Sequence, residues 1–286
     1  LGYIGSNLVR ELCKNLEFNI FVIDNLSTGS LNNILVRPNV KYYIRDTIVI
    51  QDFFPKDQEI DTVFHFGEYS RISTSFDEID LVMKNNSVGT FKILEFCKLK
   101  KAKLIYSASS SSISTNLFQK PENLSPYAWY KSKNIELIKN YYSWFGLEYK
   151  ICYFYNVYGE NHIKKGKYAT VLGIFEDLYK KGEKLTVVRP GTQKRDFTYI
   201  GDVISGIIKF CSNESQNLGS NEPRECHFRS GESFSILEVV QMFDSEYEIV
   251  DSRKGERFCA PEFKNENFCE PKMKLRDWIE SVKNEI

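Results

Sequence analysis

The chain has 286 residues, of which 42% are hydrophobic and 14% aromatic, a composition that excludes a largely disordered or fibrous protein. Lys plus Arg and Asp plus Glu both number 38, so no overall positive field favours nucleic acid or an anionic membrane as a partner. No apolar run approaches the ~18 residues of a membrane-spanning helix, and we expect a cytoplasmic protein.

The first half of the chain alternates helical and strand-like patterns. Residues 3–16 place apolar side chains on one helical face, and Phe18–Ile23 is typical of a buried strand. Further strands are predicted at Val40–Ile44, Thr62–Phe66, Leu104–Ser107 and Tyr149–Phe154, and helices near Asp80–Lys98 and Tyr127–Phe145. This alternation predicts an α/β fold with a Rossmann-type doubly wound parallel sheet.

The regular alternation of strands and helices ends after Gly159. A helix is predicted around Thr170–Lys181 and a strand near Leu185–Val188, and shorter elements follow them. We therefore predict a first domain over residues 1–157 and a smaller substrate-binding lobe over residues 158–286. A helix near residues 202–212 is expected to return to the first domain.

Two glycines open the first predicted helix. Gly2 and Gly5, with Tyr3 and Ile4 between them, let the backbone and the helix N-terminus approach a pyrophosphate. A phosphate-binding turn of this kind needs a strand before it, so we expect a strand of roughly 7–10 residues to precede Leu1 in the native protein.

Asp24 follows the next predicted strand, and it is the acidic residue that such a turn requires. A carboxylate there accepts both hydroxyls of an adenosine ribose and repels a 2′-phosphate, so NAD is predicted rather than NADP. Its neighbour Asn25 is included in the predicted cofactor site. Asp46, after the following strand, either contacts the adenine or only caps the end of that strand.

Tyr127 and Lys131 are spaced i, i+4 at the start of a predicted helix, which puts both side chains on one face. A lysine there favours the ionised form of the phenol, which then acts as a base. Ser109, in the serine-rich segment after the strand Leu104–Ser107, offers a hydroxyl that shares a proton with the tyrosine and the substrate.

A metal centre is not expected. The seven cysteines have no Cys-x-x-Cys spacing, and the three histidines lie far apart in the sequence.

Taken together, these motifs resemble the extended short-chain dehydrogenase/reductases, in the branch of NAD-dependent epimerases and dehydratases of nucleotide sugars. The resemblance covers nearly the whole chain. It rests on five features in order: Gly2-Tyr3-Ile4-Gly5-Ser6, Asp24-Asn25-Leu26, Ser109, Tyr127 with Lys131, and Asn156-Val157-Tyr158-Gly159.

The resemblance implies roles for further residues. Phe66 and Gly67 would lie beneath NAD, Asn86 and Ser107 would help to hold it, and Lys131 would bind the nicotinamide ribose. Asn156, Gln193, Arg195 and Arg253 are the candidate ligands of the sugar diphosphate, because an arginine fork can pair with two phosphate oxygens at once. Relatives also form homodimers through a four-helix bundle, here from Asp80–Lys98 and Tyr127–Phe145.

The residues after Ser109 favour one reaction of this family. Related 4,6-dehydratases carry Asp-Glu there, whereas this chain has Ser110 and Ser111, so 4-epimerisation is predicted, with UDP-glucose and UDP-galactose or their N-acetyl forms as substrates.

Three alternatives stay open. The first is a dehydratase, in which Glu68 or Arg71 restores an acid. The second is a non-catalytic NAD-binding scaffold, which the presence of both Tyr127 and Lys131 disfavours, and the third is an NADPH reductase, which Asp24 disfavours.

Overall fold

The computed structural model describes residues 1–113, 125–212, 223–255 and 271–285. Its central sheet contains four parallel strands in the order β3 (Thr62–His65), β4 (Lys103–Ser109), β5 (Tyr149–Phe154) and β9 (Glu225–Phe228). Every residue of β5 is buried, as expected for a parallel strand covered on both faces.

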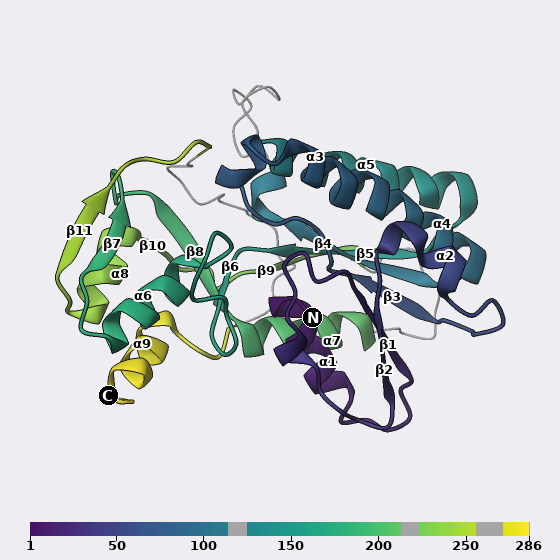
Figure 1. Cartoon of the computed structure of the whole chain (residues 1–286), viewed down its shortest axis with the longest axis horizontal. Coiled ribbons are helices and arrows are strands. Elements are labelled where there is room, and N and C mark those ends of the chain that lie inside the picture. Colours follow the sequence, from purple (N-terminus) through teal and green to yellow (C-terminus); the bar gives the residue numbers. More distant parts are fainter. Residues whose placement is uncertain (114–124, 213–222, 256–270, 286) are drawn as a thin grey trace.

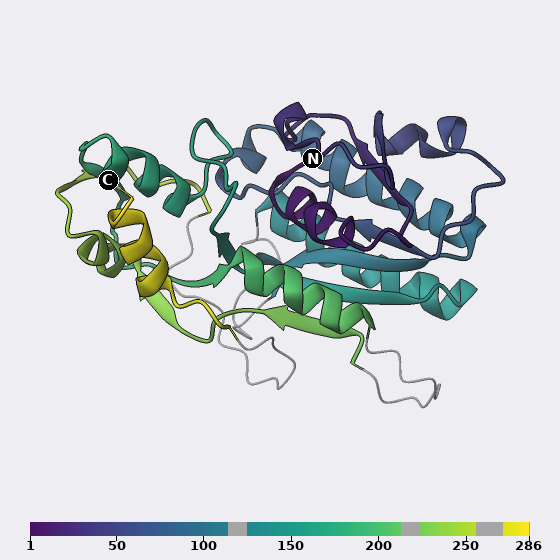
Figure 2. The same ribbon diagram turned by 90° about the horizontal axis from the view of Figure 1, so that it is seen from below.

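Helices cover both faces of this sheet (Figures 1 and 2). One face carries α2 (Ile50–Phe53), α3 (Ile79–Val82), α4 (Thr90–Lys100) and α5 (Pro126–Phe145). The other carries α1 (Tyr3–Leu12) and α7 (Ile200–Ser212), which contact each other. A parallel sheet between two helical layers confirms the predicted Rossmann-type α/β fold class.

Two more parallel strands, β1 (Ile20–Asp24) and β2 (Val40–Ile44), pair with Ile20 opposite Val40. Among the described residues, no strand joins β1 to β3. The cavity described below extends into the space between β1 and β3.

A smaller group of elements, here called the C-terminal lobe, lies beyond β6 (Asn156–Tyr158) at the end of the sheet opposite α4 (Figure 1). Its strands are β7 (Leu185–Val188), β8 (Lys194–Tyr199), β10 (Ser233–Ser235) and β11 (Tyr247–Val250), and its helices are α6 (Val171–Lys180), α8 (Ile236–Phe243) and α9 (Leu275–Lys283). Strand β8 lies between β10 and β6, and β7 pairs with β11. The lobe has its own apolar core around Phe175, Phe243 and Trp278.

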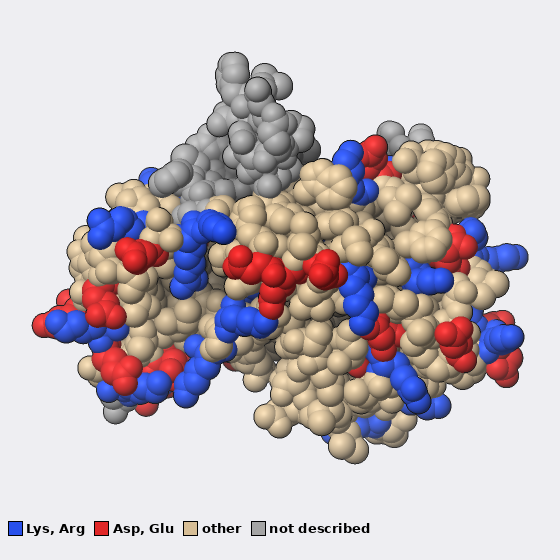
Figure 3. Space-filling view, turned by 45° about the horizontal axis from the view of Figure 1, so that its top comes forward, with Lys and Arg blue, Asp and Glu red and all other residues tan. Residues whose placement is uncertain are grey.

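Short helical turns complete the described chain: η1 (Leu31–Asn33), η2 (Thr47–Val49), η3 (Ser73–Phe76), η4 (Met83–Gly89) and η5 (Ser110–Ser112). None of the helices in the described ranges is both long enough and apolar enough to cross a membrane. Basic and acidic side chains are interspersed over the face seen in Figure 3, in keeping with equal totals of the two.

Two predicted helices have different limits in the structure. The first ends at Leu12 rather than near Leu16, because the Asn39 amide donates to the carbonyls of Cys13, Asn15 and Phe18 and holds a turn there. The helix predicted at Asp80–Lys98 is divided into α3, a π-helical segment (η4) and α4. Such wide turns are often found at functional sites.

A buried ion network ties the loop after β6 to α6. Glu176, whose side chain is 8% exposed, accepts hydrogen bonds from His162 (2.6 Å), Lys164 (2.7 Å) and Lys180 (2.9 Å). Burial by itself raises the pKa of the Glu176 carboxyl, but these three donors outweigh burial and hold the pKa well below its ordinary value. The stabilisation therefore exists above the pKa of the unfolded carboxyl, about 4.5, and is lost as the pH falls below it.

The Glu176→Gln variant is expected to lower the free energy of unfolding by about 2 kcal/mol at pH 7, because it removes a buried carboxylate with three donors. The difference in the free energy of unfolding between this variant and the wild type should narrow as the pH falls from 5 to 3. Urea unfolding, monitored by circular dichroism, measures this difference. Asp177→Asn, at an ion pair on the surface of the same helix, is the control and should change little. A difference that stays constant with pH would contradict this account.

Candidate active site

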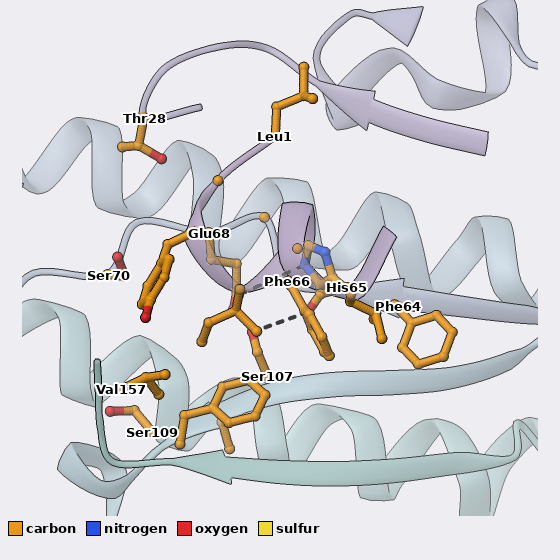
Figure 4. A pocket seen from close by; sticks show the side chains of 18 of the residues that line it. Leu1, Thr28, Phe64, His65, Phe66, Glu68, Ser70, Ser107, Ser109 and Val157 are labelled. Atoms are coloured by element: carbon orange, nitrogen blue, oxygen red, sulfur yellow. Dashed lines mark hydrogen bonds and ion pairs between the residues drawn. The ribbon is translucent and has the colours of Figure 1, made fainter. Parts of the chain in front are cut away.

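A cavity of about 1150 Å³ lies where the carboxyl ends of β3, β4 and β5 face the N-terminus of α1 and the C-terminal lobe. Figure 4 shows side chains from β3 and β4 around it, among them His65, Ser107 and Ser109. The carboxyl ends of parallel strands are the usual place for ligands in open α/β sheets.

The predicted phosphate-binding turn forms one wall of the cavity, where Gly2, Tyr3, Ile4 and Gly5 all line it. A Cβ atom added at Gly2 or Gly5 would meet nothing within 4 Å, so the space beside both glycines is open. Since α1 begins at Tyr3, the amides of its first turn face this space and can receive an anionic group.

Asp24 lies at the end of β1 and lines the same wall. Its carboxylate accepts a hydrogen bond from the amide of Leu26 (2.7 Å). Open glycines and a carboxylate on one wall fit the phosphate and ribose groups of a dinucleotide.

Asn25 and Asp46 are not among the residues that line the cavity. Asp46 caps η2 through the amide of Ile48 (3.0 Å) and pairs with Lys84 (3.0 Å), and Asn25 donates to it. Asp46 thus caps the turn that follows β2, and its contact with the adenine stays a prediction.

Tyr127 and Lys131 lie on α5, which Ser125 caps by accepting from the amide of Ala128, with Pro126 in the first turn. Both side chains line the cavity, and both are buried, Lys131 at 2% exposure. The Lys131 ammonium donates to the carbonyl oxygen and the hydroxyl of Ser107 on β4. The predicted pair therefore meets the end of the central sheet.

Ser109 is the last residue of β4 and also lines the cavity. Its hydroxyl lies 2.8 Å from that of Ser111 and accepts from the Ser111 amide (3.1 Å). Figure 4 shows Ser107 and Ser109 on the same strand beneath the cavity. The three predicted catalytic residues, Ser109, Tyr127 and Lys131, are thus brought together.

Glu68 is the principal partner of Lys131, and the sequence did not reveal this contact. The Glu68 carboxylate forms an ion pair with the Lys131 ammonium and also accepts from Thr90 (2.7 Å), Asn134 (2.9 Å) and Tyr106 (3.1 Å). Asn134 could have been found from the sequence, because it follows Tyr127 and Lys131 on one helical face at i+7 and i+3.

Asn86 has a structural role in the described fold. Its side chain is fully buried and exchanges two hydrogen bonds with the backbone of Tyr69, at 2.8 and 3.0 Å. It does not line the cavity, whereas Phe66 and Gly67, after β3, do. Asn86 fixes the loop that carries Glu68.

The predicted substrate residues Asn156, Gln193, Arg195 and Arg253 all line the cavity. The amides of Asn156 and Gln193 donate to the carbonyls of Asp196 (3.1 Å) and Val188 (3.0 Å). These four residues come from β6 and the C-terminal lobe, so the cavity has a cofactor wall on the sheet and a second polar wall facing it.

Comparisons with known proteins identify the relatives of this chain. The family model described as "NAD dependent epimerase/dehydratase family" matches residues 1–221. A putative UDP-glucose 4-epimerase of Methanocaldococcus jannaschii is 31% identical over 89% of this chain and 85% of its own. A dTDP-D-glucose 4,6-dehydratase of Dictyostelium discoideum is 27% identical over 71% of this chain and 52% of its own.

The fold also has close structural counterparts. The crystal structure of a UDP-glucose 4-epimerase from Thermotoga maritima, solved with UDP-glucose, has a TM-score of 0.82 at 23% identity and covers 99% of this chain and 95% of its own. With a family model matching more than half of the chain, and with the motifs of that family gathered around one cavity, the chain belongs to the NAD-dependent epimerase/dehydratase family.

Proposed function

We propose that the protein catalyses the NAD-dependent 4-epimerisation of a nucleotide-diphosphate sugar, either UDP-glucose and UDP-galactose or their N-acetyl forms. The observation that carries this proposal is that Tyr127 and Ser109 line the same cavity, with hydroxyls rather than carboxylates at Ser110 and Ser111. This set of groups suits proton transfer at one hydroxyl and lacks the extra acid that elimination of water needs.

The cofactor wall suits NAD. The N-terminus of α1 beside Gly2 and Gly5 would hold its pyrophosphate, and Asp24 would accept the hydroxyls of its adenosine ribose. When bound, NAD supplies the oxidising power that turns the C4 alcohol of the sugar into a ketone. Tyr127 accepts the proton of the 4-hydroxyl and later returns it, and the Ser109 hydroxyl holds that oxygen in place.

The facing wall suits the nucleotide part of the substrate. Arg195 and Arg253 would pair with the diphosphate, since a guanidinium binds two phosphate oxygens at once. Asn156 and Gln193 would orient the sugar. Holding the substrate by its diphosphate leaves the sugar free to turn over and present either face at C4.

Glu68 is poorly suited to act as the acid of a dehydratase. Its carboxylate already accepts from one ammonium, two hydroxyls and one amide, and its side chain is 1% exposed. A group held in this way cannot reach the C5–C6 bond of a sugar without breaking a buried ion pair.

The proposed reaction is tested by incubating the protein with UDP-glucose, UDP-N-acetylglucosamine or dTDP-glucose and following the sugars by NMR. We expect the 4-epimer of a UDP-sugar and no accumulated ketone. A 4-keto-6-deoxy product would establish the dehydratase alternative, and retention of NAD without any conversion would support the scaffold alternative.

The Tyr127→Phe variant removes the proposed base and should lower kcat at least about 100-fold, the usual contribution of a positioned proton-transfer group. Bound NAD, measured by its absorbance after denaturation, should be unchanged. Tyr130→Phe, on the same helix but not lining the cavity, is the matched control and should retain activity. Equal activity of the two variants would rule out the role of Tyr127.

Asp24→Asn should weaken NAD binding about 10-fold or more, because a hydrogen bond to a charged group contributes roughly 1.5–3 kcal/mol. The preference for NAD over NADP should fall as well, since the repelling charge is gone. Isothermal titration calorimetry measures both affinities. Asp46→Asn, at the capping carboxylate outside the cavity, should bind NAD like the wild type, and a loss of affinity there would indicate an adenine contact.

We also propose a homodimer formed through α4 and α5. These helices, with α3, form an outer layer (Figure 1), and they expose the large apolar side chains of Phe91, Leu99, Trp129, Trp144 and Phe145. Exposed apolar side chains gathered on adjacent helices are typical of a protein interface, and two such helices from each chain would make a four-helix bundle.

Light scattering after gel filtration should give twice the chain mass of 33.4 kDa. Phe91→Glu should shift the protein toward the monomer, because it places a charge in the apolar interface. Val36→Glu, at an exposed residue outside these helices (87% exposed), should leave the mass unchanged. A wild-type protein that is monomeric at micromolar concentration would refute the bundle.

A further inference from the structure

Arg71, in the loop after β3, lines the cavity and has donors that the protein does not use. A guanidinium has several N–H donors in one plane. Arg71 donates to the carbonyls of Ser70 (3.2 Å) and Tyr168, while its Nε atom is buried without a hydrogen-bond partner. Within the described part of the chain, no carboxylate forms an ion pair with this arginine. A cation of this kind beside a cavity is suited to bind an anionic group of a ligand.

Arg71 is held near the end of the cavity that contains Tyr127. Tyr168, whose carbonyl accepts from Arg71, belongs to the same apolar cluster as Tyr127, and so does Ile72, the residue after Arg71. Ser70, the residue before Arg71, also lines the cavity and is labelled in Figure 4. The guanidinium therefore lies on the side of the site where the proposed reaction at C4 of the sugar takes place.

Two further cations, Arg253 and Lys254, line the cavity from the C-terminal lobe. Gly255, which follows them, lies against the loop that carries Arg71, because a Cβ atom added at Gly255 would be 2.8 Å from Ile72 and 2.9 Å from Phe76. Lys254 is exposed, and none of the described carboxylates pairs with it. Positive charge from two separate segments thus gathers at this part of the cavity.

The acidic residues that line the cavity do not balance this charge. Glu68 is paired with Lys131, and Asp196 accepts from the amides of Ser230 (2.8 Å) and Gly231 (3.0 Å). Four others belong to the strands β1 and β3 or to the residues before them: Glu17, Asp24, Glu59 and Asp61. None of these acids forms an ion pair with Arg71 among the residues that the structure describes.

The diphosphate of the proposed substrate also leaves Arg71 unused. It carries one negative charge on each phosphate, and Arg195 and Arg253 can pair with both, since each guanidinium binds two phosphate oxygens. Arg71 therefore has room for a second anionic group on the same ligand.

The position of this second group follows from the two ends of the sugar. C1 carries the diphosphate, and the 4-hydroxyl lies at Tyr127 in the proposed reaction, so the substituents closest to Tyr127 are those on C3 and C5. An ordinary hexose has a hydroxyl on C3 and has C6 attached to C5. In a hexuronic acid C6 is a carboxylate, whose two oxygens match the planar fork of an arginine.

We propose that Arg71 is a specificity-determining residue that binds the C6 carboxylate of a UDP-hexuronic acid. This inference rests on the proposed function and narrows the substrate class of that same site: it adds an acidic sugar to the neutral sugars and ranks it above them. UDP-glucose is the weaker substrate, because its C6 hydroxyl leaves the guanidinium without a charged partner.

The first test measures binding and needs no turnover. The NAD-loaded protein carrying Tyr127→Phe is titrated with UDP-glucuronate, UDP-glucose and UDP by isothermal titration calorimetry. UDP-glucuronate should bind at least about 10-fold more tightly than UDP-glucose, because it gains a charge-assisted hydrogen bond. Equal affinities for the two sugars would overturn the proposal.

Arg71→Gln in the same background should weaken the binding of UDP-glucuronate at least about 10-fold and leave the affinities for UDP-glucose and UDP unchanged. A loss shared by all three ligands would mean that Arg71 binds the diphosphate, and the proposal would be wrong. If Arg71→Gln does not fold, Arg71→Lys decides the question. It keeps the charge without the planar fork, and its loss of affinity must likewise be confined to UDP-glucuronate.

Arg10→Gln is the matched control, because Arg10 is an exposed arginine on α1 that does not line the cavity. This variant removes the same charge and should bind both sugars as the Tyr127→Phe protein does. If Arg10→Gln weakens UDP-glucuronate as much as Arg71→Gln does, the preference comes from overall charge rather than from a contact, and the proposal fails.

Turnover separates this inference from the proposed function. In the wild type, kcat/KM for UDP-glucuronate should exceed that for UDP-glucose at least about 10-fold, with UDP-galacturonate identified as the product by NMR. If UDP-glucuronate binds preferentially but neither sugar is epimerised, the proposed reaction is wrong and the carboxylate site stands. If UDP-glucose is epimerised and no preference is found, the reaction stands and the role of Arg71 is wrong.

Discussion

The carbonyl oxygen of Ser107, near the end of β4, accepts a hydrogen bond from the ammonium of Lys131, and this contact fixes α5 on the central sheet. Since Tyr127 lies one turn before Lys131, fixing the lysine also fixes the helical turn that carries the phenol. Ser109, two residues beyond Ser107 on β4, lines the same cavity. The carboxylate of Glu68, in the loop after β3, forms an ion pair with the ammonium of Lys131. Helix α5, strand β4 and the loop after β3 are thereby held together, and the proposed proton transfer at Tyr127 depends on their arrangement.

The surrounding fold supplies the two walls that this centre needs. The parallel strands end at one edge of the sheet, where α1 presents its N-terminus beside the open glycines. The C-terminal lobe faces that edge with Arg195 and Arg253. The Glu176 network secures the loop after β6 to α6, so the position of the second wall is itself stabilised by buried charge.

Regular elements could be predicted from the sequence where one local pattern decided the structure. Strands Val40–Ile44, Tyr149–Phe154 and Leu185–Val188 have the expected limits, because β-branched and aromatic residues alternate with clear turn signals. The end of α1 was not predictable, since it depends on Asn39 from a later turn. The partner of Lys131 was equally hidden, because Glu68 lies 63 residues away in sequence and only the fold brings the two together.

Motif residues also differed in how far their roles could be predicted. Their spacing in the sequence predicted a common site for Tyr127, Lys131, Ser109 and Asp24, and all four line one cavity. The prediction was possible because each residue lies at the end of a strand or near the start of a helix. The side chain of Asn86 exchanges two hydrogen bonds with the backbone of Tyr69, a contact that no local pattern encodes.

The central claim is that one hydrogen leaves C4 of the sugar and returns to the same carbon. The most direct measurement supplies a UDP-sugar carrying deuterium at C4 in ordinary water and locates the label by NMR once both epimers are present. The account predicts deuterium at C4 of both epimers, without exchange with solvent. Loss of the label to water, or its appearance at another carbon of the sugar, would contradict it.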